Sequence, residues 1–181
     1  MSGGLRLKFI ESRDRHNYPF PDHLTFKTID LPARRAFEIL AETPGSKDCV
    51  LLVCGYLGQG PILRLLKQLL EADNTLRVHA VCGENGAAFE EVSREFQDRP
   101  NVQIHAAVGS LIDLMRESGC VITKPGISTI LETQAAKRKL FLVKGIPVAE
   151  NCYNAGHACA QFGAEWFSVE SFRRWRATSG G

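Results

Sequence analysis

Residues 49–61 read Cys-Val-Leu-Leu-Val-Cys-Gly-Tyr-Leu-Gly-Gln-Gly-Pro, an apolar run followed by a glycine-rich stretch. A continuous apolar run of this length is typical of a strand covered on both faces, as in a parallel sheet. Residues 62–70 follow with an amphipathic pattern that predicts a buried helix. This strand–loop–helix unit indicates the fold, because the same alternation recurs along the chain.

The repeated alternation predicts an α/β fold, a Rossmann-like, doubly wound parallel sheet. Further strands are expected at 77–82, 102–106, 120–123 and 140–143, each followed by a helix, at 87–96, 111–117, 128–136 and 152–162. We divide the chain into a linker or N-terminal-domain remnant at 1–44, one domain at 45–170 and a frayed tail at 171–181. The first segment holds four prolines and no complete strand–helix unit.

The composition excludes several functional classes. The 181 residues are 44% hydrophobic and 23% charged, as in a soluble globular protein and unlike a disordered one. A formal net charge of +2 provides no basic field that would attract nucleic acid. No apolar run approaches the roughly 20 residues of a membrane helix, and no secretory signal is visible.

The six cysteines include no Cys-x-x-Cys pair, which favours a reducing compartment and a cytoplasmic location. Cys152, His157 and Cys159 lie close enough in sequence to suggest a metal cluster. Because a fourth ligand at zinc-like spacing is missing, a shared buried helix face is the better interpretation of the two cysteines.

Three loops follow strands at their carboxyl ends, where open parallel sheets bind ligands. In the first loop, Gly55, Gly58 and Gly60 would allow backbone N–H groups to approach an anion such as phosphate. Their spacing, G-x-x-G-x-G, differs from the dinucleotide motif G-x-G-x-x-G. The alternative is that these glycines serve only the tight turn after a buried strand.

The second loop, residues 123–132, has the composition of a phosphate-binding helix start. Gly126, Ser128 and Thr129 offer hydroxyls and backbone donors, and Glu132 one turn later is suited to a ribose diol. The alternative is a capped helix in which Glu132 is a favourable first-turn charge. Lys124 is expected either to face a diphosphate or to be solvated.

The third loop, residues 144–151, is also polar. Glu150 and Asn151 are suited to hydrogen bonds with sugar hydroxyls, or to capping the helix that follows.

Taken together, residues 28–169 resemble the C-terminal, donor-binding domain of GT-B glycosyltransferases, such as monogalactosyldiacylglycerol synthases and the bacterial peptidoglycan N-acetylglucosaminyltransferase. The first loop is similar to their G-G-G-x-G-M-G-P motif. Residues 81–85 are similar to their V-C-G-[RK]-N motif, with Glu84 at the position where that motif has a basic residue. Residues 121–132 resemble I-T-K-x-G-x-x-T-I-x-E, and residues 31–37 resemble the interdomain linker. The resemblance implies a single half of a GT-B fold.

The resemblance also implies that the chain binds a UDP-sugar without a metal or other cofactor. Glu132 would hold the ribose, and the backbone near Val108 would face the uracil. The diphosphate would meet the first two loops, and the hexose would meet Glu150 and Asn151. The family's P-G-Q-E motif reads Pro-Val-Ala-Glu at 147–150, which leaves the identity of the sugar open.

The function implied is the UDP-sugar-binding half of a hexosyltransferase that acts on a lipid or other acceptor. In this family the N-terminal half supplies the acceptor site and the catalytic base, so the sequence identifies no catalytic residue. We expect that the chain either is a fragment or divergent gene product, or works with a partner. That partner would carry the N-terminal half or be a membrane-associated acceptor partner, with peripheral membrane attachment through it. The alternatives are a non-catalytic nucleotide-binding module or partner subunit, and an NAD-dependent Rossmann protein with Glu84 on the ribose.

Overall fold

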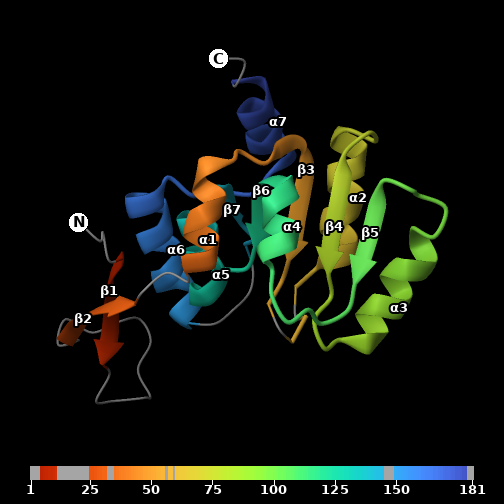
Figure 1. The fold of residues 1–181 in the computed structure, drawn as a ribbon. Helices are drawn as coiled ribbons and strands as arrows, with labels where there is room; N and C mark the ends of the chain where they lie inside the picture. The colour runs from red at the N-terminus through yellow and green to blue at the C-terminus, as the bar shows by residue number, and fades with distance from the viewer. Residues whose placement is uncertain are drawn as a thin grey trace.

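The computed structural model describes residues 5–11, 25–31, 35–55, 57–58, 60–144 and 149–178. For 5–11, 25–31, 35 and 149–153 only the backbone is described. Its centre is a six-stranded parallel sheet in the order β5-β4-β3-β6-β7-β8 (Figure 1). The strands are β3 (Ser46–Val53), β4 (Arg77–Val81), β5 (Val102–His105), β6 (Ser118–Thr123), β7 (Lys139–Leu142) and β8 (Glu165–Trp166).

The strand order confirms the predicted doubly wound sheet. The chain enters at the centre with β3, moves outward through β4 and β5, and then returns to the other side of β3 with β6. From there it moves outward again through β7 and β8. The crossover leaves a crevice between the carboxyl ends of β3 and β6, the usual ligand position in such sheets.

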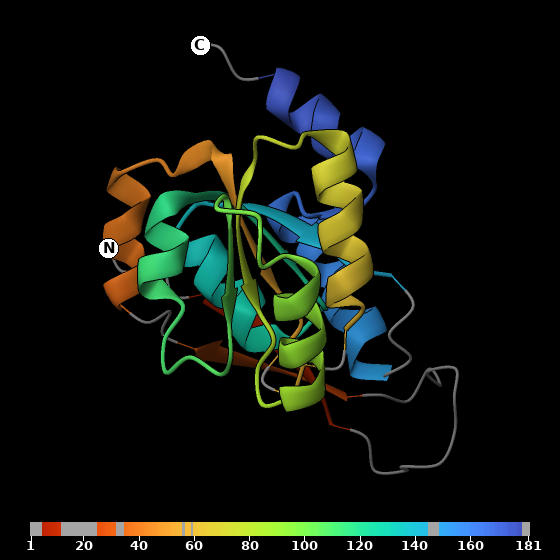
Figure 2. The same ribbon diagram turned by 90° about the vertical axis from the view of Figure 1, so that its right-hand side faces the viewer.

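Helices cover both faces of the sheet (Figure 2). One face carries α2 (Ile62–Ala72), α3 (Gly86–Glu95) and α7 (Val169–Ala177). The other carries α1 (Arg35–Ile39), which leads into a short 3-10 helix (Leu40–Glu42), α4 (Ile112–Glu117) and α5 (Ile127–Ala135). A further helix, α6 (Ala149–Phe162), packs with α5 against β7.

The burial of β3 on both faces explains why the apolar run at residues 49–54 is continuous. In β3, Val50 and Leu52 belong to the core beneath α2, whereas Leu51 and Val53 belong to the core beneath α4. All four side chains are at most 4% exposed. Because side chains alternate between the faces of a strand and both faces are covered, every position is apolar.

The N-terminal region is more structured than the predicted linker or remnant at 1–44. β1 (Leu5–Glu11) and β2 (Thr25–Leu31) form a separate antiparallel pair. Phe37 and Leu40 are 1% and 3% exposed and form part of the core beneath α4. The domain core therefore draws on residues before position 45.

The predicted frayed tail at 171–181 is wrong as far as Ala177, because helix α7 occupies this segment. Ser168 and Ser171 form a capping box at its start. Phe172 is fully buried and lies 6.1 Å, centroid to centroid, from the Phe141 ring of β7. Of the basic residues that suggested a solvated tail, Arg173 and Arg174 are exposed, whereas Arg176 is partly buried and pairs with Asp48 and Asp73.

Within the described part of the chain, no helix combines the length and the apolar character needed to cross a membrane. The expected cytoplasmic location and peripheral attachment stay predictions.

Candidate functional site

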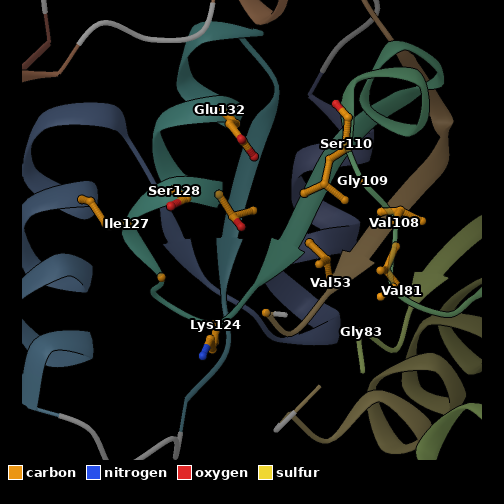
Figure 3. Close-up of a pocket in the computed structure, with 15 residues that line it drawn as sticks. Val53, Val81, Gly83, Val108, Gly109, Ser110, Lys124, Ile127, Ser128 and Glu132 are labelled. Atoms are coloured by element: carbon orange, nitrogen blue, oxygen red, sulfur yellow. The ribbon is translucent and has the colours of Figure 1, made fainter. Parts of the chain in front are cut away.

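A pocket of about 390 Å³ opens at the carboxyl ends of the central strands (Figure 3). Its volume falls in the range of about 300–1,000 Å³ typical of small-molecule sites. Four segments line it: the end of β3 with Val53 and Gly55, the end of β4 with Val81 and Gly83, the loop 107–111, and the β6–α5 segment with Lys124, Gly126, Ile127, Ser128, Thr129 and Glu132. The pocket therefore lies at the crossover between β3 and β6.

Most of the residues singled out from the sequence line this one pocket. They are Gly55, Val108, Lys124, Gly126, Ser128, Thr129 and Glu132. The structure thus brings together residues from three loops that are far apart in the sequence. Their role in binding a donor stays a prediction.

Gly58 and Gly60 are not among the lining residues, and close packing is a sufficient reason for glycine at both positions, while their contact with a diphosphate stays a prediction. Gly58 has a φ of +57°, and a Cβ there would lie 2.0 Å from the carbonyl oxygen of Cys82. A Cβ at Gly60 would lie 2.3 Å from the Cys54 Sγ. Asn85 Nδ2 also donates to the Gly58 carbonyl oxygen at 3.2 Å. These contacts favour the tight-turn alternative at both positions.

Lys124 lies across the turn after β3. A Cβ at Gly55, whose φ is +84°, would come within 2.4 Å of the Lys124 Cε. Figure 3 shows the amino group pointing away from Glu132. Burial raises the pKa of the neighbouring Cys54 thiol to about 12, although the Lys124 charge opposes this shift. Cys54 is therefore a protonated core residue and no nucleophile at neutral pH.

Helix α5 begins at the pocket wall. Its N-cap, Gly126, is extended and provides no side-chain hydrogen bond to the first-turn N–H groups. Ser128 is exposed and Thr129 is half-buried in that first turn. Glu132 follows one turn later, and Figure 3 shows its carboxylate directed toward the side of the pocket formed by Gly109. The helix start thus offers unsatisfied donors, two hydroxyls and one carboxylate to the same cavity.

The predicted third loop is shorter than expected, because Glu150 and Asn151 already lie in the first turn of α6. Their side chains and residues 145–148 fall outside the described residues. Their expected contact with the hexose stays a prediction.

Farther along α6, Asn154 has a structural role. Its side chain is 8% exposed and donates from Nδ2 to the carbonyl oxygen of Pro125 at 3.1 Å. This bond fixes α6 to the loop that precedes α5. The metal cluster considered for Cys152, His157 and Cys159 also falls on α6, where the Cys152 side chain is outside the described residues.

Part of the pocket was not predicted from the sequence. In the loop 107–111 only Val108 was expected to lie at the site, whereas Gly109, Ser110 and Leu111 also line the cavity, as does Gly83 after β4. A usable signal was present, because both segments follow parallel strands and so lie at the same edge of the sheet.

The sequence matches no protein-family model, but it is similar to curated proteins. The processive diacylglycerol beta-glucosyltransferase of Bacillus pumilus (strain SAFR-032) is 31% identical over 140 residues, which cover 68% of this chain and 35% of that enzyme. The enzyme of the same name from Bacillus cereus (strain G9842) is 32% identical over 108 residues, covering 59% of this chain and 28% of that enzyme. The chain thus spans about a third of the length of the curated relatives that it matches.

A solved structure shares the fold. MurG of Acinetobacter baumannii superposes with a TM-score of 0.57 and 20% sequence identity, covering 90% of this chain and 49% of that chain. At this level of identity the likeness concerns the fold alone.

Proposed function

We propose that this chain, which belongs to the GT-B glycosyltransferases and corresponds to their C-terminal part, binds a UDP-sugar donor for hexosyl transfer. The observation that carries the proposal is the shared pocket. It combines the open start of α5, the Glu132 carboxylate and the backbone of the loop 107–111. Each of these three parts suits one portion of a nucleotide diphosphate.

The start of α5 is suited to the diphosphate. A helix N-terminus carries partial positive charge and free N–H donors, which favour phosphate. Gly126 at the N-cap has no side chain that would compete for these donors. In the proposal, the hydroxyls of Ser128 and Thr129 add further hydrogen bonds, and Lys124 contributes positive charge from the pocket wall.

Glu132 is suited to the ribose. An ionised carboxylate accepts hydrogen bonds through both oxygens, so it can receive both hydroxyls of a ribose diol. The loop 107–111 lies across the pocket and presents backbone groups where the base would lie, near Val108. A uracil edge carries donors and acceptors that match such backbone groups.

The proposal needs no metal in the pocket. Glu132 is the only carboxylate among the described lining residues, and a divalent cation on a diphosphate usually relies on additional protein oxygens. The helix dipole of α5 and Lys124 provide the positive charge instead.

The reaction proposed is displacement at the anomeric carbon of the sugar. The bond from that carbon to the diphosphate oxygen breaks, and its electron pair leaves with UDP. An acceptor hydroxyl forms the new bond and gives its proton to a base. We assign the acceptor site and that base to a partner or to further sequence, because the pocket is proposed to bind the donor.

The NAD-binding alternative is disfavoured by the position of Glu84. This residue was the candidate ribose acid, but it does not line the pocket, whereas the preceding Gly83 does. The glycine spacing after β3 argues against it as well.

Calorimetric titration tests the proposal directly. With a chelator present, the full chain should bind UDP and not NAD. Glu132→Gln should weaken UDP binding by roughly ten- to a hundredfold, because a charge-assisted acceptor is lost. Glu84→Gln, the matched control, should bind UDP as the parent chain does. Equal UDP affinity for the parent chain and Glu132→Gln would contradict the proposal.

A further inference from the structure

A second group of side chains that can bind a metal lies beneath α4. It is four residues before the end of β3 that borders the pocket. Cys49, His79 and Glu117 contribute a thiol, an imidazole and a carboxylate, and their ligand atoms all lie within 4.8 Å of one another. The His79 Nε2 is 3.5 Å from the Glu117 Oε2. The Cys49 Sγ also lies 3.7 Å from the Ser118 Oγ.

The strand register produces this group. In the parallel pairing of β3 with β4, Cys49 lies opposite Arg77 and Leu51 lies opposite His79. Cys49 and His79 therefore share the face of the sheet that α4 covers. Glu117 is the last residue of α4, directly before β6, the strand on the other side of β3.

His79 has the hydrogen-bonding pattern of a ligand. His79 is 4% exposed, and its buried Nε2 has no hydrogen-bond partner among the residues that the structure describes. Its Nδ1 lies 3.2 Å from the His105 Nε2. With the proton on Nδ1 and donated to His105, the Nε2 lone pair faces the thiol and the carboxylate. Metal-bound histidines are commonly oriented by such a bond from the other ring nitrogen.

We propose that Cys49, His79 and Glu117 bind a zinc ion, with a fourth position left to water. Thiolate, imidazole and carboxylate are the ligands that zinc takes in tetrahedral sites. The separation of the His79 and Glu117 atoms fits two ligands on one ion of about 2.0–2.2 Å bond length. The ion would link β3, β4 and the junction between α4 and β6, at a distance from the donor pocket.

Arg77 competes with the proposed ion. Its Nη1 lies 3.3 Å from the same Glu117 Oε2, and its side chain is 53% exposed. Because the guanidinium is solvent-accessible, it can turn outward when the carboxylate binds a cation. Removing its charge should therefore favour metal binding.

The experiment is a titration of the full chain with zinc, with the thiols kept reduced by a non-thiol reductant. The parent chain should bind one zinc ion per chain. Cys49→Ser and Glu117→Gln should each weaken binding by at least about a hundredfold, since even residues that only support ligands cost about 10- to 100-fold. With cobalt as the probe, the parent chain should show a thiolate-to-metal absorption band that Cys49→Ser lacks.

Controls separate this site from adventitious binding and from misfolding. Cys159→Ser and Asp113→Asn change a cysteine and an exposed acid elsewhere and should bind zinc as the parent chain does. Glu117→Gln alters a half-exposed side chain, so circular dichroism should match that of the parent chain. Arg77→Gln should bind zinc at least as tightly as the parent. Absence of stoichiometric zinc binding, equal binding by Cys49→Ser, or weaker binding by Arg77→Gln would overturn the proposal.

Discussion

Two turns of this domain contain glycine at the carboxyl end of a central strand, yet they differ in what surrounds the glycines. After β3, a Cβ at Gly58 would meet the Cys82 carbonyl oxygen at 2.0 Å. After β6, a Cβ at Gly126 would meet no atom of the described residues closer than the flexible Lys124 side chain, at 3.7 Å. At Gly58 the first turn is closed by its neighbours, although Gly55 in the same turn lines the pocket, whereas at Gly126 the second turn opens into the pocket.

The difference separates two uses of glycine that look alike in a sequence. Glycine permits a positive φ and close backbone packing, and it also leaves room for a ligand. In the first turn, packing and φ account for Gly58. In the second, Gly126 has an ordinary φ of −79°, and the described residues leave space for a side chain. Neither φ nor packing against these residues therefore requires glycine there, and a contact with the diphosphate stays a prediction.

The largest effect is expected from Gly58→Ala. The new Cβ would clash with the backbone, and alanine would have to keep a left-handed conformation. The free energy of unfolding should therefore fall by at least about 2 kcal/mol. Thermal or urea unfolding of the purified variant measures this loss. A variant as stable as the parent chain would mean that the turn relaxes readily and that the comparison between the two turns fails.

Asp73→Asn provides a stability reference outside both turns. Hydrogen bonds from Thr75, and then Arg176, lower the pKa of Asp73 from 3.8 to about 2. The stabilisation is present above pH 4 and is lost as the pH falls from about 4 to about 2. The variant should therefore be less stable than the parent chain by about 1.5 kcal/mol at pH 6 and equally stable near pH 2.

Unfolding of both chains across this pH range gives the measurement, and UDP affinity at pH 7 should not change. A stability difference that is independent of pH would show that Asp73 does not act through its charge.

Gly126→Ala should separate binding from stability in the second turn. The methyl group would enter the proposed diphosphate site, so UDP affinity should fall roughly tenfold, about the cost of one hydrogen bond to a charged group. Stability should fall by no more than about 1 kcal/mol, the scale of an N-cap substitution. Calorimetry and thermal unfolding of the same preparation provide both numbers. Loss of stability without loss of affinity would assign Gly126 to packing.

The smallest effect is expected from Ser128→Ala. Removal of this exposed hydroxyl should lower UDP affinity by about fivefold, because a single hydrogen bond contributes about 1 kcal/mol net. Unfolding should be unaffected, because Ser128 is exposed at the helix start. Glu150→Gln is the matched comparison and should leave UDP affinity unchanged while altering the preference among UDP-sugars. An equal loss of UDP affinity in both variants would contradict the assignment of Ser128 to the diphosphate.

The sequence predicted the sheet well, because buried parallel strands require unbroken apolar runs such as 49–54. It also predicted lining residues of the β6–α5 segment, because polar residues follow directly after the end of a strand there. It could not separate Gly58 from a ligand-binding glycine, since the atoms that exclude a side chain there belong to another loop. Helix α7 was missed because three arginines lie among its apolar residues Phe172 and Trp175, and the aspartates that pair with Arg176 are far away in the sequence.

The position of α7 has a consequence for how the domain is made. Phe172 fills the space beside Phe141, and their rings lie 6.1 Å apart, although α7 follows every strand of the sheet in the chain. The part of the sheet around Phe141 is therefore covered only once α7 has been made and has docked. A chain that ends before α7 would lack the rings of Phe172 and Trp175 beside Phe141 and would expose this part of its apolar core.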